Sequence, residues 1–354
     1  MSRAERDIGA RPAAGGRRRR GGVRTSEGSP PTTATETPEA SSAAEASEAF
    51  LALRPLMFSI AYRMLASVSE AEDMVQEVFV RYQQALGDGV HVVSPKAYLS
   101  AAITRLCIDH LRSAPKRREA YVGQWLPEPL LTDVEATDPA AHAEQADSLS
   151  MAFLLVLERL NPIERAVFLL HDVFDYGYDE IAEIVGKSET NCRQLAARAR
   201  RHVKAEKPRF EASREQRQEL AARFFAALSQ GDLDGLVGIL ADDVVAYGDG
   251  GGKAPQWSIP IVGAERVARV FVQMSRELRE HEITIEPQHV NGQPGAVLRT
   301  SDGQLINVFS LDIADGVVQT VRSVINPDKL HHIGPVADVY VMRRQRRAER
   351  TRDA

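Results

Sequence analysis

Residues 178–204 carry the pattern that most narrows what this chain can fold into. Apolar side chains recur at helical spacing from Tyr178 to Val185, which predicts a first helix with one buried face. Gly186 permits a tight turn, and Ser188 can accept amide hydrogen bonds where a second helix begins. The pattern predicts a helix-turn-helix whose second helix enters the major groove of DNA. An ordinary helical hairpin with a solvated basic face is the alternative.

Charge is distributed unevenly along the 354 residues, whose formal net charge is −5. The segment from Lys96 to Arg118 holds six basic residues against one acid, and the segment from Lys187 to Arg209 holds eight against two. Between Glu135 and Glu180 the bias reverses, with ten acids against two arginines. Two separate basic patches on an acidic chain predict two points of contact with a polyanion.

Length and composition set the outer limits. The chain has room for two or three domains, and its 44% hydrophobic content is that of a globular protein. Cys107 and Cys192 lie far apart and outside any paired metal-ligand spacing, so we expect plain thiols in a reducing compartment and no metal or cofactor. No apolar run approaches the roughly 18 residues of a membrane span, and no signal peptide is recognisable. These features predict a cytoplasmic protein without a membrane contact.

Composition also predicts the domain boundaries. We expect a disordered tail over 1–47, helices over 48–115, a proline-containing linker over 116–145 and helices again over 146–206. Over 213–330, helices give way to strands separated by glycine turns. Residues 331–354 end in a basic stretch that we expect to be a poorly ordered tail. The predicted fold is therefore multidomain: two all-α domains, the second a helix-turn-helix, followed by an α+β domain with a curved antiparallel sheet.

The first helical unit places an acidic helix before a basic one. In SEAEDMVQEVFVRYQQAL, apolar residues such as Val75 and Val78 share one side and acidic residues fill the other. After Pro95, the segment AYLSAAITRLCIDHLR forms a second helix that runs into three basic residues at 116–118. A proline linker and a helix-turn-helix follow in this specific order.

This order resembles the extracytoplasmic function sigma factors of bacterial RNA polymerase. EDMVQEVFVR at 72–81, AYLSAAITRLCIDHLR at 97–112 and the helix-turn-helix at 178–204 carry the resemblance. WLPEP at 125–129, DGGGK at 249–253 and NPDKL at 326–330 are similar to the subgroup with a fused SnoaL-like domain, here 213–330. The resemblance implies core RNA polymerase and promoter DNA as partners and a cone-shaped C-terminal domain.

The resemblance assigns roles to three sets of residues. Polymerase would be bound by the exposed acidic face at Asp73, Gln76 and Glu77. In the first domain, the minus-ten element would be contacted by Arg105, Asp109, Arg112, Lys116 and Arg117. In the helix-turn-helix, the minus-thirty-five duplex would be contacted by Ser188, Glu189, Asn191, Arg193, Gln194, Arg198, Arg200 and Arg201.

Alternatives stay open for these assignments. Asp109 can instead be an intrahelical partner of Arg105 or Arg112, and part of the arginines can be solvated. Leu195 stands where many relatives place a basic residue, and Cys192 replaces a frequent valine, so the charge pattern of this helix is shifted and does not define its exact base contacts.

Three hypotheses account for the function of the C-terminal domain. Relatives of this fold include cyclases and isomerases, for which Asp243, Asp249 and His289 are candidate acid–base groups, although no triad or metal spacing supports catalysis. A small-molecule-sensing pocket is a second reading. The favoured one is a non-catalytic, regulatory domain that makes an intramolecular contact with the sigma domains. That interface would comprise Trp125, Leu126, Pro127, Asp249, Gly250, Gly251, Gly252, Lys253, Asn326, Pro327, Asp328 and Lys329.

Two other function classes compete with a sigma factor. One is a SnoaL-like enzyme fused to a DNA-binding module, and the other is a helix-turn-helix repressor that needs no polymerase. The acidic docking helix and the presence of two basic units disfavour the repressor.

Overall fold

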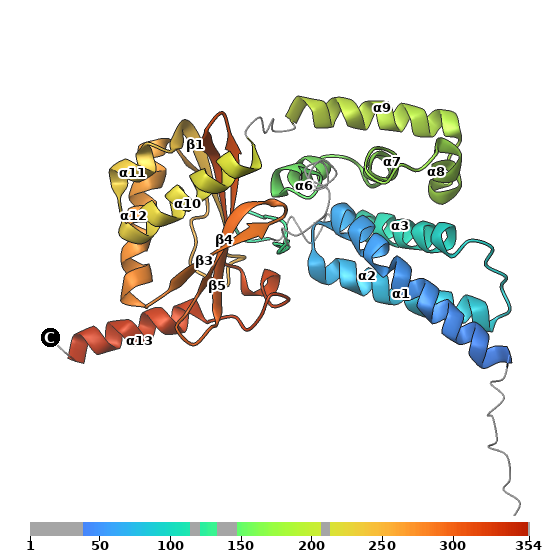
Figure 1. Ribbon diagram of the computed structural model, residues 1–354, viewed down its shortest axis with the longest axis horizontal. Coiled ribbons are helices and arrows are strands. Elements are labelled where there is room, and N and C mark those ends of the chain that lie inside the picture. Colours follow the sequence, from blue (N-terminus) through green and yellow to red (C-terminus); the bar gives the residue numbers. More distant parts are fainter. Residues whose placement is uncertain (1–37, 114–120, 133–146, 207–212, 353–354) are drawn as a thin grey trace, which may run out of the picture. The chain divides into compact units, whose positions relative to one another are not determined.

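The computed structural model describes residues 38–113, 121–132, 147–206 and 213–352 (Figure 1). The side-chain contacts discussed below lie within the compact unit Ala43–Ala354. None of the described helices is long and apolar enough to cross a membrane.

Three helices form the first helical unit: α1 (Pro38–Leu65), α2 (Val68–Gly87) and α3 (Pro95–Ser113). The apolar side predicted for α2 is buried at Ala71, Val75, Val78 and Tyr82. The helix α1 begins at Pro38, so residues 38–47, which were expected to belong to the tail, are helical. Residues 1–37 lie outside the described part of the chain.

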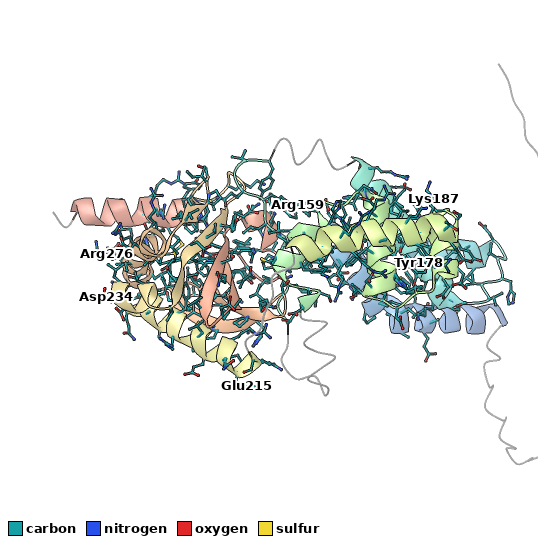
Figure 2. All side chains as sticks on the ribbon, turned by 90° about the horizontal axis from the view of Figure 1, so that it is seen from above. Arg159, Tyr178, Lys187, Glu215, Asp234 and Arg276 are labelled. Carbon is teal, nitrogen blue, oxygen red and sulfur yellow. The ribbon has the colours of Figure 1, made fainter. Side chains whose placement is uncertain are left out.

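The second helical unit consists of α6 (Met151–Leu157), α7 (Pro162–Asp172), α8 (Tyr178–Val185) and α9 (Glu189–Glu206). Gly186 ends α8 in the left-handed conformation, with φ of 64°, and the amide of Asn191 donates to Ser188 Oγ. The helix-turn-helix is therefore confirmed as α8 and α9. Tyr178 at the start of α8 and Lys187 in the turn before α9 are labelled in Figure 2.

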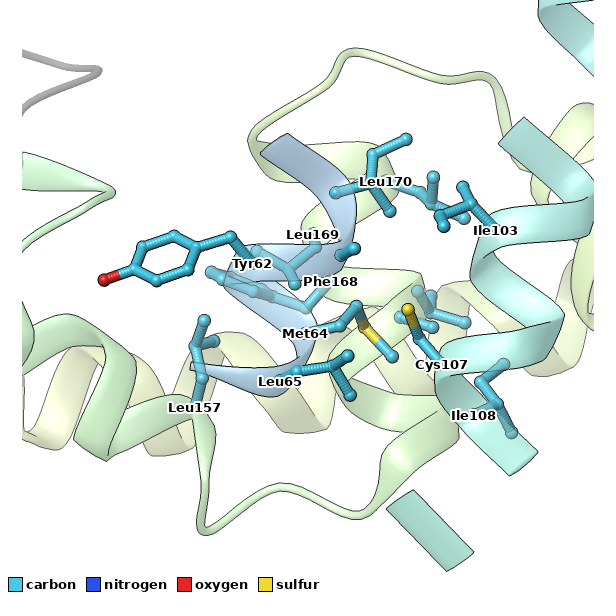
Figure 3. Close-up of a cluster of buried hydrophobic side chains, with 14 of the residues drawn as sticks. Tyr62, Met64, Leu65, Ile103, Cys107, Ile108, Leu157, Phe168, Leu169 and Leu170 are labelled. Carbon is cyan, nitrogen blue, oxygen red and sulfur yellow. The ribbon is translucent and has the colours of Figure 1, made fainter. Parts of the chain in front are cut away.

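Both helical units contribute to one hydrophobic core. Met64 and Leu65 of α1 lie near Cys107 of α3 and near Phe168 and Leu169 of α7 (Figure 3). On α9, Leu195 is buried in this same core, as are Cys192, Ala199 and Val203. The apolar Leu195 therefore faces inward, which explains why the charge pattern of α9 skips that position.

The C-terminal domain contains a six-stranded sheet with the order β2-β1-β6-β5-β4-β3. Its strands are β1 (Leu240–Asp249), β2 (Ile261–Val262), β3 (Thr284–Val290), β4 (Gln293–Arg299), β5 (Leu305–Ala314) and β6 (Val317–Val324). The helices α10 (Arg214–Gln230), α11 (Leu233–Val237) and α12 (Ala264–Glu280) lie on one side of it (Figure 1). Phe224, Phe271 and Phe309 pack edge to face between these layers.

Two features of this domain differ from the expectations. The sheet is mixed, because β1 pairs with β6 in parallel while the other neighbours are antiparallel. The long connection from β1 through α12 and β3–β5 brings the chain back beside β1 in the same direction. In addition, the basic stretch expected to be poorly ordered is helical: α13 (Val339–Arg352) follows the short η1 (Pro327–Lys329), and Arg343 of α13 pairs with Glu277 of α12.

Candidate functional site: the helix-turn-helix and the motif clusters

The opening of α9 presents the side chains expected to read DNA. Ser188, Glu189, Arg193 and Gln194 are exposed, whereas Asn191 is half-buried. The guanidinium of Arg193 pairs with Glu189 at 3.0 Å and lies over the ring of Tyr178. These side chains therefore face solvent at the start of α9, while Cys192 in the same turn faces the core.

The remaining arginines of α9 are exposed, and two of them pair with acids of α7. Arg200 Nε donates to Asp172 at 2.7 Å, and Arg198 lies 3.6 Å from Glu164. Arg201 Nε donates to the carbonyl of Ala197. The partly exposed Arg200–Asp172 pair contributes about 0–1 kcal/mol, whereas Arg198 pairs with Glu164, whose side chain is only 10% exposed.

The basic residues of α3 are placed differently from one another. Asp109 pairs with Arg112 at 3.0 Å, which is the intrahelical alternative considered from the sequence. Arg105 donates to two backbone carbonyls at the end of α8, Ile184 O and Glu183 O, each at 2.8 Å. Lys116 and Arg117 lie outside the described residues. Arg105 is therefore engaged by the helix-turn-helix here, which its sequence position did not suggest.

The residues of α2 predicted to bind polymerase lie on its solvent-facing side, away from its buried apolar side. Asp73, Gln76 and Glu77 are exposed, and Glu77 accepts a hydrogen bond from Arg81 at 2.7 Å. Their spacing of three and four residues gathers them on one face of the helix.

The three sequence motifs meet around one buried carboxylate. Asp249, at the end of β1, is fully buried. Its Oδ2 accepts from the amide of Leu126 and from Lys329 Nζ, both at 2.8 Å, and its Oδ1 accepts from the hydroxyl of Tyr121. The backbone carbonyl of Asp249 accepts from Asn326 N at 3.0 Å. We call these residues the Asp249 cluster: Tyr121, Leu126, Asp249, Asn326 and Lys329.

Lys329 is the cation of this cluster. It also donates to the carbonyl of Leu126 and lies 4.2 Å from the ring centroid of Trp125 and 4.9 Å from that of Tyr121. Burial lowers the pKa of Lys329, and the charge of Asp249 opposes that shift. The pKa of Tyr121 is raised, chiefly by burial and then by Asp249, so its phenol stays a neutral donor at physiological pH. Lys329 therefore joins the WLPEP and DGGGK motifs electrostatically and through hydrogen bonds.

The glycines of DGGGK allow the close approach of the NPDKL motif. Gly251 has φ of 57°, and a Cβ on it would lie 2.3 Å from the Asn326 side chain. Beside this contact, Lys253 pairs with Asp328 at 2.6 Å on the surface, with both side chains more than half exposed. Within WLPEP, Leu126 and Pro127 are buried and Trp125 is half-buried. Leu126 is therefore more deeply packed than Trp125.

Sequence reasoning missed a second group of contacts, centred on Asn291. This fully buried residue occupies the β3–β4 turn with φ of 54°. Its Nδ2 donates to the Tyr62 hydroxyl at 2.5 Å and to Leu149 O at 3.0 Å, and its Oδ1 accepts from Leu130 N at 3.0 Å. We call Tyr62, Leu130, Leu149 and Asn291 the Asn291 cluster. The Asn291-Gly292 pair between two strands is typical of a hairpin turn. Nothing in the neighbouring sequence predicts that the Asn291 side chain is buried and contacts Tyr62 of α1.

The role of Glu128 in the WLPEP motif was also not predicted from the sequence. Its Oε2 accepts from the amides of Val68 at 2.8 Å and Ser69 at 3.0 Å, and its Oε1 accepts from Ser67 Oγ at 2.8 Å. These amides open α2, where a negative charge is favoured by the helix dipole. A residue of the 121–132 segment therefore caps a helix of the first domain.

Replacing this carboxylate should weaken the native state measurably. We expect Glu128→Gln to lower the free energy of unfolding by about 1–3 kcal/mol, because an amide cannot serve all of these donors. Glu77→Gln, an exposed change on α2 itself, should alter it by less than about 0.5 kcal/mol. Urea unfolding of both variants measures the difference, and equal stabilities would contradict the capping role.

The candidate acid–base residues of the C-terminal domain do not converge on one site. Asp243 is exposed on β1, Asp249 is enclosed in its cluster, and His289 is partly exposed on β3 near Gln218. Burial, Arg214 and Arg217 lower the pKa of His289. Among the described residues, no group of three or more His, Cys, Asp or Glu side chains could hold a metal ion. The three residues therefore do not form a common site at which one substrate could contact all of them.

Comparisons with known proteins agree with this division of the chain. Residues 49–117 match Sigma-70 region 2, residues 150–203 match Sigma-70, region 4, and residues 221–344 match the SnoaL-like domain. Hereafter, region 2 and region 4 denote the first two of these segments.

Whole-chain relatives carry the same combination. The chain is 38% identical over 292 residues to the ECF RNA polymerase sigma factor SigJ of Mycobacterium tuberculosis, covering 79% of this chain and 91% of the relative. It is 33% identical to the probable ECF RNA polymerase sigma factor SigI of the same organism, with 80% and 94% covered. The crystal structure of SigJ matches with a TM-score of 0.63 at 34% identity, over 82% of this chain and 99% of that one. The chain therefore belongs to the extracytoplasmic function (ECF) sigma factors of RNA polymerase.

Proposed function

We propose that this protein binds core RNA polymerase in the cytoplasm, directs it to promoters through region 2 and region 4, and is regulated by its own SnoaL-like domain. The observation that carries the proposal is the exposed, arginine-rich α9 of the helix-turn-helix, in the same chain as the acidic face of α2. A repressor would need only the first of these surfaces.

Promoter reading is assigned to the start of α9. Arg193 and Gln194 are exposed there and can form the bidentate contacts that distinguish base pairs in the major groove. Arg198, Arg200 and Arg201 follow on the exposed side and would bind phosphates, supplying affinity without sequence information. Asp109 and Arg112 of α3 remain candidates for the minus-ten strand, as do Lys116 and Arg117.

Polymerase docking is assigned to Asp73, Gln76 and Glu77. We expect the triple alanine variant of the full chain to retain about one tenth or less of the core polymerase that copurifies with the wild type, because it loses the exposed acidic face. A matched variant, Glu219→Ala, Asp242→Ala and Asp243→Ala, removes exposed acids from the C-terminal domain and should copurify normally. Equal recovery of polymerase by both variants would contradict the assignment.

Regulation is assigned to the two clusters around the 121–132 segment. Asp249 and Lys329 bind this segment at Leu126, and Asn291 binds it at Leu130 and contacts Tyr62 of region 2. A fused domain is present at high effective concentration, so such contacts can govern region 2 without a separate protein.

Removing the C-terminal domain tests the regulatory role. Deletion of the residues after 210 should change promoter-dependent transcription with core polymerase, in either direction. Unchanged transcription and unchanged polymerase binding would remove the regulatory claim while leaving the sigma-factor assignment intact.

A further inference from the structure

The C-terminal domain contains a cavity of about 390 Å³ that the sigma-factor function does not use. Its walls come from the loop at Trp257, from α12, from strands β4–β6 and from α13. The volume is in the range of small-molecule pockets, roughly 300–1,000 Å³. The walls are mainly apolar, as the following side chains illustrate: Met274, Leu278, Leu298, Ile306, Ile325 and Met342.

The polar part of the wall is a neutral hydrogen-bonded trio. Gln256 Nε2 donates to Ser323 Oγ at 2.9 Å, and Asn307 Nδ2 donates to the same oxygen at 2.8 Å. The amide groups of Gln256 and Asn307 keep further donor and acceptor capacity beyond these bonds. A ligand can therefore be oriented there through a hydroxyl, carbonyl or amine without any charge.

Charged side chains of the lining belong to α12, to the residue after it and to α13. Glu277 and Arg343 neutralise each other at 2.6 Å, with side chains about 40% exposed, and His281 follows α12. Burying an ion in apolar surroundings without a partner costs several kcal/mol. The interior therefore favours an uncharged molecule.

The helix α13 is a weakly held wall of this cavity. It contributes Val339, Met342 and Arg343, which share one face at spacings of three and four residues. The exposed Arg343–Glu277 pair adds only about 0–1 kcal/mol to this small apolar contact. A ligand that contacts Met342 would add to the interactions that hold α13 in place.

We propose that this cavity binds a neutral, largely apolar small molecule with a hydrogen-bonding group, and that α13 is the lid of the site. The cavity shares none of its lining with the Asp249 or Asn291 clusters. The proposal therefore stands independently of the regulatory contacts described above.

Two fluorescent probes with one scaffold test the chemistry on the full-length protein. N-phenyl-1-naphthylamine is neutral, and 1-anilinonaphthalene-8-sulfonate adds an anionic group. We expect the neutral probe to bind at least tenfold more tightly than the sulfonate. Equal or tighter binding of the sulfonate would overturn the neutral class of ligand.

Cavity-filling variants locate the binding. Ile306→Trp, on the sheet, and Gln273→Trp, at an exposed position of α12, should each weaken binding of the neutral probe at least tenfold. Gln273→Trp keeps the test sound if the buried change impairs folding. Ile259→Trp is the control, because Ile259 is 73% exposed and outside the cavity. Undiminished binding to Gln273→Trp, or to a folded Ile306→Trp, would place the probe elsewhere and overturn the proposal.

Limited trypsin digestion tests the lid, because the sequence of α13 is rich in arginine. A helix must open locally before it is cleaved, so a ligand that bridges the sheet and α13 should protect it. At ten times its dissociation constant, the neutral probe should slow cleavage after Arg343 and Arg344 by about tenfold. An unchanged cleavage rate with bound probe would overturn the lid.

Discussion

Lys329→Met should lower the free energy of unfolding by about 3–5 kcal/mol, because it leaves the buried Asp249 carboxylate without its cation. Lys329 and Asp249 are 8% and 0% exposed and lie 2.8 Å apart, so the variant leaves a buried carboxylate without its counter-ion. The hydrogen bond from Lys329 to Leu126 O is lost in the same variant. Urea unfolding measures the change.

A matched lysine in the same motifs provides the control. Lys253 pairs with Asp328 at 2.6 Å, but these side chains are 58% and 54% exposed. Lys253→Met should therefore cost only about 0–1 kcal/mol. Equal losses for the two lysines would show that burial does not determine the strength of these pairs.

The double variant Asp249→Asn, Lys329→Met separates charge from packing. With both charges removed, part of the loss should be recovered, since no uncompensated ion remains in the interior. A double variant less stable than Lys329→Met alone would mean that hydrogen bonds to the carboxylate outweigh its desolvation.

The sequence predicted helices, turns and motifs better than it predicted which distant residues contact one another. The periodic spacing from Tyr178 to Val185, with Gly186 after it, was enough for the helix-turn-helix because those signals act within a few residues. The glycines of DGGGK predicted a sharp turn or a close approach, and the contact of Gly251 with Asn326 is of that kind. Such inferences need no knowledge of distant segments.

Contacts between distant segments could not be read in the same way. Asn291 contacts Tyr62, 229 residues away, and Arg105 contacts the end of α8, 78 and 79 residues away. A buried asparagine and a solvated one look alike in sequence, and an arginine on a basic helix fits phosphate and backbone carbonyl equally well. The parallel pairing of β1 with β6 was missed for a related reason. The relative direction of two paired strands depends on the path of the long segment that connects them.

Region 2 and region 4 share one hydrophobic core in this structure. The minus-ten and minus-thirty-five elements are about 25 base pairs apart, or roughly 85 Å of duplex at about 3.4 Å per pair. A compact body of about 160 residues has a radius of gyration near 15 Å, too small to reach both elements. If the protein binds both elements as proposed, the two regions must therefore separate first.

Arg105→Ala should make that separation easier. Its exposed guanidinium donates to Ile184 O and Glu183 O, two carbonyls at the negative end of the α8 dipole, and two such solvent-exposed hydrogen bonds together contribute about 1–2 kcal/mol. Amide hydrogen exchange in the peptide covering α8 should therefore become roughly 5 to 30 times faster in this variant. Mass spectrometry of the full-length protein measures it.

Arg112→Ala is the matched comparison, because it also removes a candidate DNA-binding cation from α3. Arg112 is exposed and pairs only locally with Asp109 among its described contacts, so exchange in α8 should stay within about twofold of the wild type. If both variants leave α8 exchange unchanged, Arg105 does not hold the two regions together. If Arg105→Ala alone accelerates exchange, its guanidinium links region 2 to the helix-turn-helix in the free protein.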